Sequence, residues 1–251
     1  MKLYKEISIR KHADEPTLAM LDLWRSLSEH KTGVPIEVMV GNRREHKQLG
    51  SFRGELNTAY PSVHDGKPIL VLWMDSFSNV KPLIIAHELG HWVLNLQGFH
   101  SFNYRPSKNS NIEILLNSMA SHVPLYALQR SLGHKPDDEI DSRALHNIKL
   151  FATKVKSEKN IMANALMLAD DIMNCSSGNR TSLLNVINRN YSKTSKYIKE
   201  IMNLGSTFDL LFPDQNLAFR KKIIEQLDLS KNWYEVRNSE SLISLVEKSR
   251  K

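Results

Sequence analysis

The sequence contains a single cysteine, Cys175, and no run of apolar residues that approaches the length of a membrane span. One cysteine excludes an internal disulfide bond and is typical of proteins from a reducing cytoplasm. A membrane-spanning helix needs about 18 or more consecutive apolar residues, so we expect no membrane partner. The first six residues lack the apolar core of a secretion signal. These absences predict a cytoplasmic protein.

The sequence of 251 residues carries a modest excess of positive charge, with a formal net charge of +7 and a pI near 9.4. This excess allows contact with nucleic acid or an acidic protein. However, the only local basic clusters are Arg43-Arg44 and Arg220-Lys221-Lys222, and neither has an aromatic series beside it. These basic clusters are therefore interpreted as solvated surface rather than as a nucleic-acid site. The hydrophobic content of 41% is enough to form a buried core.

The motif H-E-x-x-H spans His87 to His91 and follows the apolar run at residues 83–86. Residues four apart lie on one face of an α-helix, so both imidazoles can point at one metal ion. Two histidines supply two of the three protein ligands of a catalytic zinc site and leave room for water. Glu88 lies beside the first ligand, where a general base for that water is needed.

The residues around the motif favour a helix. Pro82 suits a first helical turn and Gly98 suits a stop signal. Apolar residues recur with helical spacing on the side opposite the histidines, at Ile85, Leu89, Val93 and Leu96. The alternative is that both histidines belong to a core and Glu88 stands between them by chance. The amphipathic helix favours the zinc site.

The third ligand is harder to identify. Leu94 and Gln97 stand where the extended three-histidine motif needs glycine and histidine, which excludes that class. Glu113 opens an amphipathic segment about twenty residues after His91, a spacing that lets a returning helix complete a His₂Glu site. The alternative is a first-turn glutamate that only favours the helix dipole. Asp170-Asp171 is the second choice.

Three further side chains, His122, Tyr104 and Tyr126, are candidates for stabilising the oxyanion of a transition state. For each of them a structural role is the more common one. His100 follows Gly98 and is interpreted as an exposed loop histidine.

The sequence predicts an α+β fold in which a small zincin-like sheet of about three strands packs on the H-E-x-x-H helix. A helix over 16–29 is followed by strands at 36–40, 51–57 and 69–74, with turns at Tyr60-Pro61 and Asp65-Gly66. Residues 1–130 would form a metallopeptidase domain, and residues 131–251 a helical region that recognises substrate or a regulator or covers the site. The expected helices of that region lie at 140–155, 160–174, 181–191, 195–204 and 215–227.

At these residues the chain resembles the ImmA/IrrE family of bacterial and phage-borne zinc metalloproteases. The resemblance covers roughly residues 33–125 and rests on three features. A hydrophobic strand precedes the motif, His87-Glu88-Leu89-Gly90-His91 follows an apolar run, and a later helix carries Glu113, Asn117 and Ala120, with Pro124 after it. The resemblance implies cleavage of a cytoplasmic regulator, typically a helix-turn-helix repressor or its relative.

The sequence therefore predicts a zinc-dependent, gluzincin-like metallopeptidase. Zn²⁺ would be held by His87, His91 and Glu113, with Glu88 as the catalytic base, and its substrate would be a protein or peptide. The alternative is a zinc-containing regulatory or DNA-binding protein with little proteolysis. Glu88 argues against that alternative, because a structural zinc needs no base and has four protein ligands.

Overall fold

The computed structural model describes residues 3–42, 58–74, 82–104, 110–153, 157–226, 233–236 and 238–249. The chain forms two compact units. The first comprises Met1–Gly98, Leu128–His134 and Arg237–Lys251, and the second comprises Phe99–Ala127 and Lys135–Val236. The end of the chain thus returns to the unit in which the chain begins, and residue 130, the expected domain boundary, lies within a helix.

The first unit contains most of the strands and the helix that carries the motif. In chain order its elements are β1 (Leu3–Lys5), α1 (Glu6–Arg10), α2 (Glu15–Thr32), β2 (Glu37–Asn42), β3 (Thr58–His64), β4 (Lys67–Met74), α3 (Pro82–Leu96) and α10 (Asn238–Ser249).

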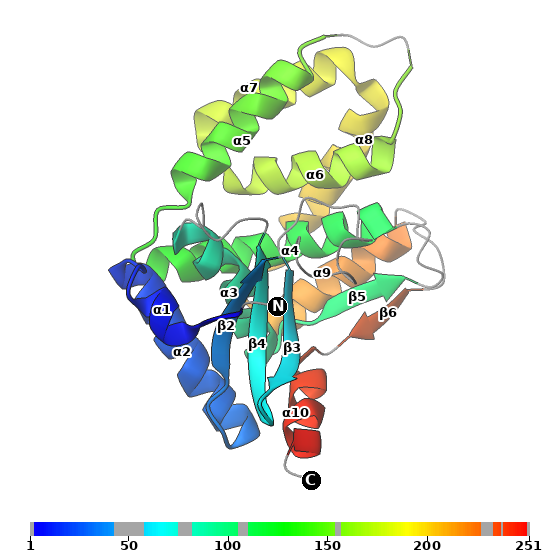
Figure 1. Ribbon diagram of the computed structural model, residues 1–251. Helices are drawn as coiled ribbons and strands as arrows, with labels where there is room; N and C mark the ends of the chain where they lie inside the picture. The colour runs from blue at the N-terminus through cyan, green and yellow to red at the C-terminus, as the bar shows by residue number, and fades with distance from the viewer. Residues whose placement is uncertain are drawn as a thin grey trace. The chain divides into compact units, whose positions relative to one another are not determined.

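Among the described residues, four strands form the sheet of this unit, in the order β1-β2-β4-β3 (Figure 1). β2 and β4 run parallel, whereas the other pairs are antiparallel. The strands predicted at 36–40 and 69–74 are confirmed as β2 and β4, and the one predicted at 51–57 lies outside the described residues. The turn predicted at Tyr60-Pro61 is wrong, because both residues belong to β3. β3 is the last strand of the sheet, where a proline without an N–H is tolerated.

The β3–β4 hairpin turns at Asp65-Gly66, as predicted. Both residues have positive φ angles, 49° and 74°, which a two-residue turn of type I′ requires. The pairing of His64 with Lys67 places only these two residues in the loop.

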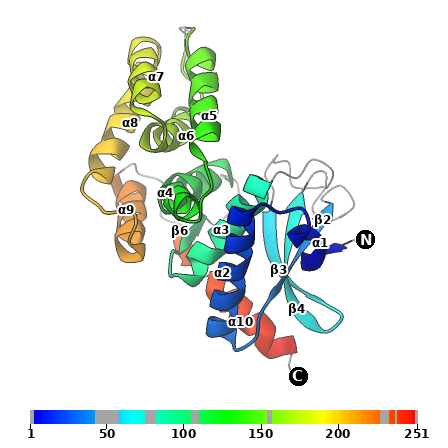
Figure 2. The same cartoon turned by 90° about the vertical axis from the view of Figure 1, so that its left-hand side faces the viewer.

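The middle of the sheet, formed by β2 and β4, is buried on both faces. Val38, Val40, Leu70 and Leu72 share one core with α2, α3 and α10, which cover the same face in Figure 2. The alternate residues form a second buried cluster of Met39, Ile69, Val71 and Trp73. Two buried faces explain the uninterrupted apolar run of β4, because no position in the middle of that strand faces water.

Capping residues set the two ends of α2, and Trp24 anchors it in the core. The side chain of Asp14 accepts a hydrogen bond from Thr17 N at 3.0 Å, and Gly33 ends the helix with a φ of 75°. Trp24 is fully buried, and its indole N–H donates to the carbonyl of Ile36 at 2.8 Å. This bond joins the helix to the residue that precedes β2.

The second unit is mainly helical. Its elements are β5 (Ser101–Tyr104), α4 (Ser110–Ser131, of which residues 110–127 belong here), α5 (Asp137–Leu150), α6 (Ile161–Asn174), α7 (Ser177–Asn190), α8 (Ser192–Gly205), α9 (Pro213–Gln226) and β6 (Trp233–Val236). The five helices predicted from residue 140 onward are confirmed as α5 to α9, and β5 pairs antiparallel with β6. The fold is therefore mixed α+β with a mainly helical second unit.

Pro124 lies inside α4 and does not end it, contrary to the expectation from the resemblance. A proline inside a helix removes the hydrogen bond to the carbonyl four residues earlier, here that of Ala120. The buried side chain of Asn216 in α9 replaces it, because its Nδ2 donates to the Ala120 carbonyl at 2.7 Å. The helix therefore continues to Ser131 without leaving this carbonyl unpaired.

Candidate metal centre

α3 presents the motif on one face and a core stripe on the other. The predicted stripe is confirmed, since Ile85, Leu89, Val93 and Leu96 are all buried. His87 and His91 are partly buried, and their ring centroids lie 5.0 Å apart with an angle of 83° between the ring planes. The two imidazoles are thus neighbours on the less buried side of a helix whose other side is fixed in the core.

Glu88 lies between these histidines and is also partly buried. Burial raises the pKa of its carboxyl from 4.5 to about 8. A buried carboxyl with no nearby cation favours its protonated form, and a cation beside it would lower the pKa again. A pKa in this range is suited to a group that accepts and returns a proton near neutral pH.

His122 lies on α4 and is fixed by a carboxylate. Its Nδ1 is 2.7 Å from Oδ2 of Asp170, and both side chains are buried. The phenol ring of Tyr126 packs against the imidazole of His122 at a tilt, with the two ring centroids 5.1 Å apart. With an ionised carboxylate at Nδ1, the proton of a neutral imidazole resides there, and Nε2 keeps a lone pair.

One potential ligand atom from each of His87, His91 and His122 lies within 4.8 Å of the other two. These three histidines could therefore hold a metal ion. Three imidazoles with an open fourth position are a known ligand set for catalytic zinc. The pairing of His122 with Asp170 matches the carboxylate–histidine arrangement that commonly orients metal-bound imidazoles. The donor set thus fits zinc.

Asp170 belongs to a buried polar network on α4, α5 and α6. Arg143 donates to Asp170 at 3.2 Å and also bonds Asp171, whose other oxygen accepts from Asn147 at 2.6 Å. Asn174 donates to the second oxygen of Asp170 at 2.9 Å. Each carboxylate oxygen therefore has a partner, as buried charges require.

The two carboxylates of this network differ in pKa. Burial opposes the ionisation of Asp170, but His122 and Arg143 outweigh it and lower the pKa of Asp170. For Asp171 burial prevails, and its pKa is raised despite its contacts with Arg143 and Asn147. Asp170 is therefore the more firmly ionised of the two and the stronger acceptor for an imidazole N–H.

The remaining predicted site residues lie as follows. Glu113 is in the first turn of α4, is partly buried, and is not in the group of three close histidines, so its role as a ligand stays a prediction. Tyr126 accepts a hydrogen bond from Arg143 at 3.3 Å, and burial raises its pKa to about 12. Tyr104 ends β5, and its side chain lies outside the described residues. His100 lies in a loop as expected, but it is partly buried rather than exposed, because its Nδ1 pairs with Glu235 at 2.5 Å.

Sequence reasoning placed His122 among the candidates for the oxyanion and missed its pairing with Asp170. The available signal was Asp170-Asp171, two adjacent carboxylates on an otherwise apolar helical run. Such a pair on a buried face needs cationic or hydrogen-bonding partners, but the sequence does not identify them.

Comparison of the chain with protein-family models, curated proteins and solved structures found no match. None of the described helices is both long and apolar enough to cross a membrane.

Proposed function

We propose that the protein is a zinc-dependent metallopeptidase that hydrolyses a peptide bond in a protein or peptide substrate. The observation that carries the proposal is the arrangement of α3. His87 and His91 lie side by side on its less buried face, and Glu88, the residue suited to act as base, stands between them. A metal site that served only structure would need no such carboxyl.

His87 and His91 would hold the ion, and His122 is the third candidate ligand from the group of close histidines. When bound, zinc would polarise the scissile carbonyl and lower the pKa of a coordinated water to about 7. The imidazoles must be neutral to bind, so protons compete with the metal and its affinity should fall in acid.

Glu88 would move the proton. Its carboxylate would accept a proton from the attacking water, and its carboxyl would then donate that proton to the leaving amine. Because burial alone raises the pKa of Glu88 to about 8, a nearby cation is needed to keep it ionised at neutral pH. The base would therefore be active only when the ligand histidines hold their ion.

The substrate class rests on the resemblance to ImmA/IrrE proteases, which implies a cytoplasmic regulator of the helix-turn-helix type. β3 is an outer strand of the sheet and contacts α3, so an extended substrate has a strand edge close to the motif helix. One carbonyl of β3, that of Ala59, already accepts a hydrogen bond from the indole N–H of Trp92 in α3 at 3.3 Å.

The test is Glu88→Gln, assayed on a peptide library prepared from bacterial cytoplasmic proteins. We expect this variant to keep about one zinc per chain and to lose at least a hundredfold in hydrolysis. Glu29→Gln, an exposed glutamate of α2, is the matched control and should keep full activity. Hydrolysis by Glu88→Gln at the rate of the wild type would overturn the proposal. So would salt-dependent binding of DNA by a wild-type chain that cleaves no peptide in the library.

A further inference from the structure

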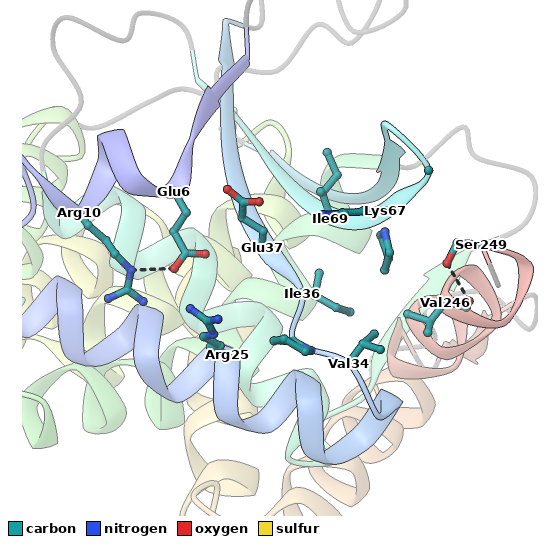
Figure 3. Close-up of a pocket in the computed structure, with 13 residues that line it drawn as sticks. Glu6, Arg10, Arg25, Val34, Ile36, Glu37, Lys67, Ile69, Val246 and Ser249 are labelled. Carbon is teal, nitrogen blue, oxygen red and sulfur yellow. Dashed lines mark hydrogen bonds and ion pairs between the residues drawn. The ribbon is translucent and has the colours of Figure 1, made fainter.

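A cavity lies at the end of the sheet where β2 and β4 begin. It has a volume of about 720 Å³ and is lined by residues from α1, α2, the hairpin, the starts of both strands and the last turns of α10 (Figure 3). Since β2 and β4 are parallel, Glu37 and Lys67 mark the same end of the sheet. This volume is within the range of pockets that hold small organic molecules.

The inner wall of the cavity is apolar. Ile36 and Val246 line it from the face of the sheet that packs on α2, α3 and α10, Ile69 lines it from the other face, and each is at most 2% exposed. Pro68 and Val34 extend this wall. A ligand that fills the cavity must therefore present an apolar body to these side chains.

Glu6 and Arg10 line the cavity but are already engaged. Glu6 accepts hydrogen bonds from Arg10 Nε at 2.8 Å and from Val38 N at 3.0 Å. Arg10 also donates to Asp22 at 2.7 Å. These charges stabilise the joint between α1, α2 and β2, and a ligand gains little from them.

Three other charged side chains of the lining are not engaged. The side chains of Arg25, Glu37 and Lys67 make no hydrogen bond or ion pair with another described residue. All three are exposed, and Figure 3 shows them around the apolar wall. Two cations against one carboxylate leave a single positive charge to be neutralised.

We propose that this cavity binds a small amphipathic monoanion, with its apolar body against Ile36, Ile69 and Val246 and a carboxylate head against Arg25 and Lys67. Glu37 would restrict the head to one negative charge, because a dianion would be repelled by this carboxylate. The proposal does not rest on the proposed hydrolysis, since none of these residues belongs to the candidate metal centre.

The test is to titrate the full chain with octanoate, octanol and octyl phosphate, and to measure binding by calorimetry and by methyl NMR. We expect octanoate to bind with a Kd below about 1 mM and to shift the methyl signals of Ile36, Ile69 and Val246. Octanol and the dianionic octyl phosphate should each bind at least about fivefold more weakly.

Charge reversal tests the head group. Arg25→Glu and Lys67→Glu should each weaken octanoate binding about fivefold or more. Lys31→Glu, an exposed lysine of α2 outside the cavity, is the matched control and should leave the Kd within about twofold. His87→Ala should also bind octanoate normally, which separates this proposal from the hydrolytic one. Any one of three results would overturn the proposal. These are equal binding of octanol and octanoate, unchanged binding in both charge-reversed variants, and methyl shifts confined to residues other than Ile36, Ile69 and Val246.

Discussion

His122 pairs through its Nδ1 with Asp170, and the hydrogen-bond network behind Asp170 keeps the imidazole oriented. Arg143 and Asn174 bind the same carboxylate, so rotation of Asp170 away from the imidazole would break several contacts at once. An imidazole fixed in this way loses little conformational freedom when it binds an ion. This is the physical reason to consider His122, rather than a residue closer in sequence, as the third ligand.

Removal of single side chains tests this assignment. We expect His122→Ala to weaken zinc binding by at least about tenfold and Glu113→Gln to change it by less than about threefold, measured by competition with a chromophoric chelator. The reverse pattern would instead support the sequence-based prediction that Glu113 completes the site.

Asp170→Asn tests the orienting role separately. An amide cannot hold the Nδ1 proton as a carboxylate does, so zinc affinity should fall about 10- to 100-fold while the ligands themselves are retained. Asp138→Asn, at an exposed position in the first turn of α5, is the control and should bind zinc normally. Unchanged affinity in Asp170→Asn, with circular dichroism showing a folded chain, would contradict the role of Asp170.

At the scale of elements, α4 continues through Pro124 because Asn216 replaces the missing hydrogen bond. Asn216→Ala would leave the carbonyl of Ala120 without its partner, at a cost of about 1–3 kcal/mol in the free energy of unfolding. In a Pro124→Ala background the backbone N–H of residue 124 can bond Ala120 instead, so the cost should be smaller. A double-mutant cycle by urea denaturation measures the difference, and additive effects would refute this account.

The N-terminus of α8 depends on a carboxylate from a preceding segment. Glu158 accepts hydrogen bonds from the backbone N–H groups of Lys193 and Thr194, at 2.9 and 2.8 Å. Burial opposes its ionisation, but these bonds outweigh it and lower the pKa of Glu158 below 4.5. A lowered pKa in the folded state means that the stabilisation is complete above pH 4.5 and is lost as the pH falls below that value.

We therefore expect Glu158→Gln to be less stable than the wild type by about 1 kcal/mol at pH 7. The difference should shrink as the pH falls below 4.5, because the wild-type carboxylate then takes up a proton. Chemical denaturation at a series of pH values measures it. A stability difference that stayed constant down to pH 3 would show that the charge of Glu158 does not contribute.

At the scale of the whole molecule, the last helix completes the first unit. Leu242 of α10 is fully buried in the core that contains α2, α3 and one face of the sheet. Leu242→Ala should lower the free energy of unfolding by about 2–5 kcal/mol, as expected for a cavity in a core. A loss of less than about 0.5 kcal/mol in thermal or chemical denaturation would show that α10 is dispensable.

Much of this architecture was predictable from local patterns. The stripe of α3, the apolar run of β4, the Asp65-Gly66 turn and five helices of the second unit follow from periodicity and turn chemistry. What could not be predicted depends on residues distant in sequence. The return of α10, the continuation of α4 past Pro124 and the pairing of His122 with Asp170 each need a partner that no local pattern identifies.

X-ray absorption at the zinc edge of the metal-loaded chain is the sharpest test of the proposed metal centre, because it reports both the presence of the ion and its ligands. We expect about one zinc per chain with three protein ligands, at least two of them imidazoles, and one water in an open position. A chain that binds no zinc when it is supplied in excess, or a zinc with four protein ligands and no water, would contradict this expectation.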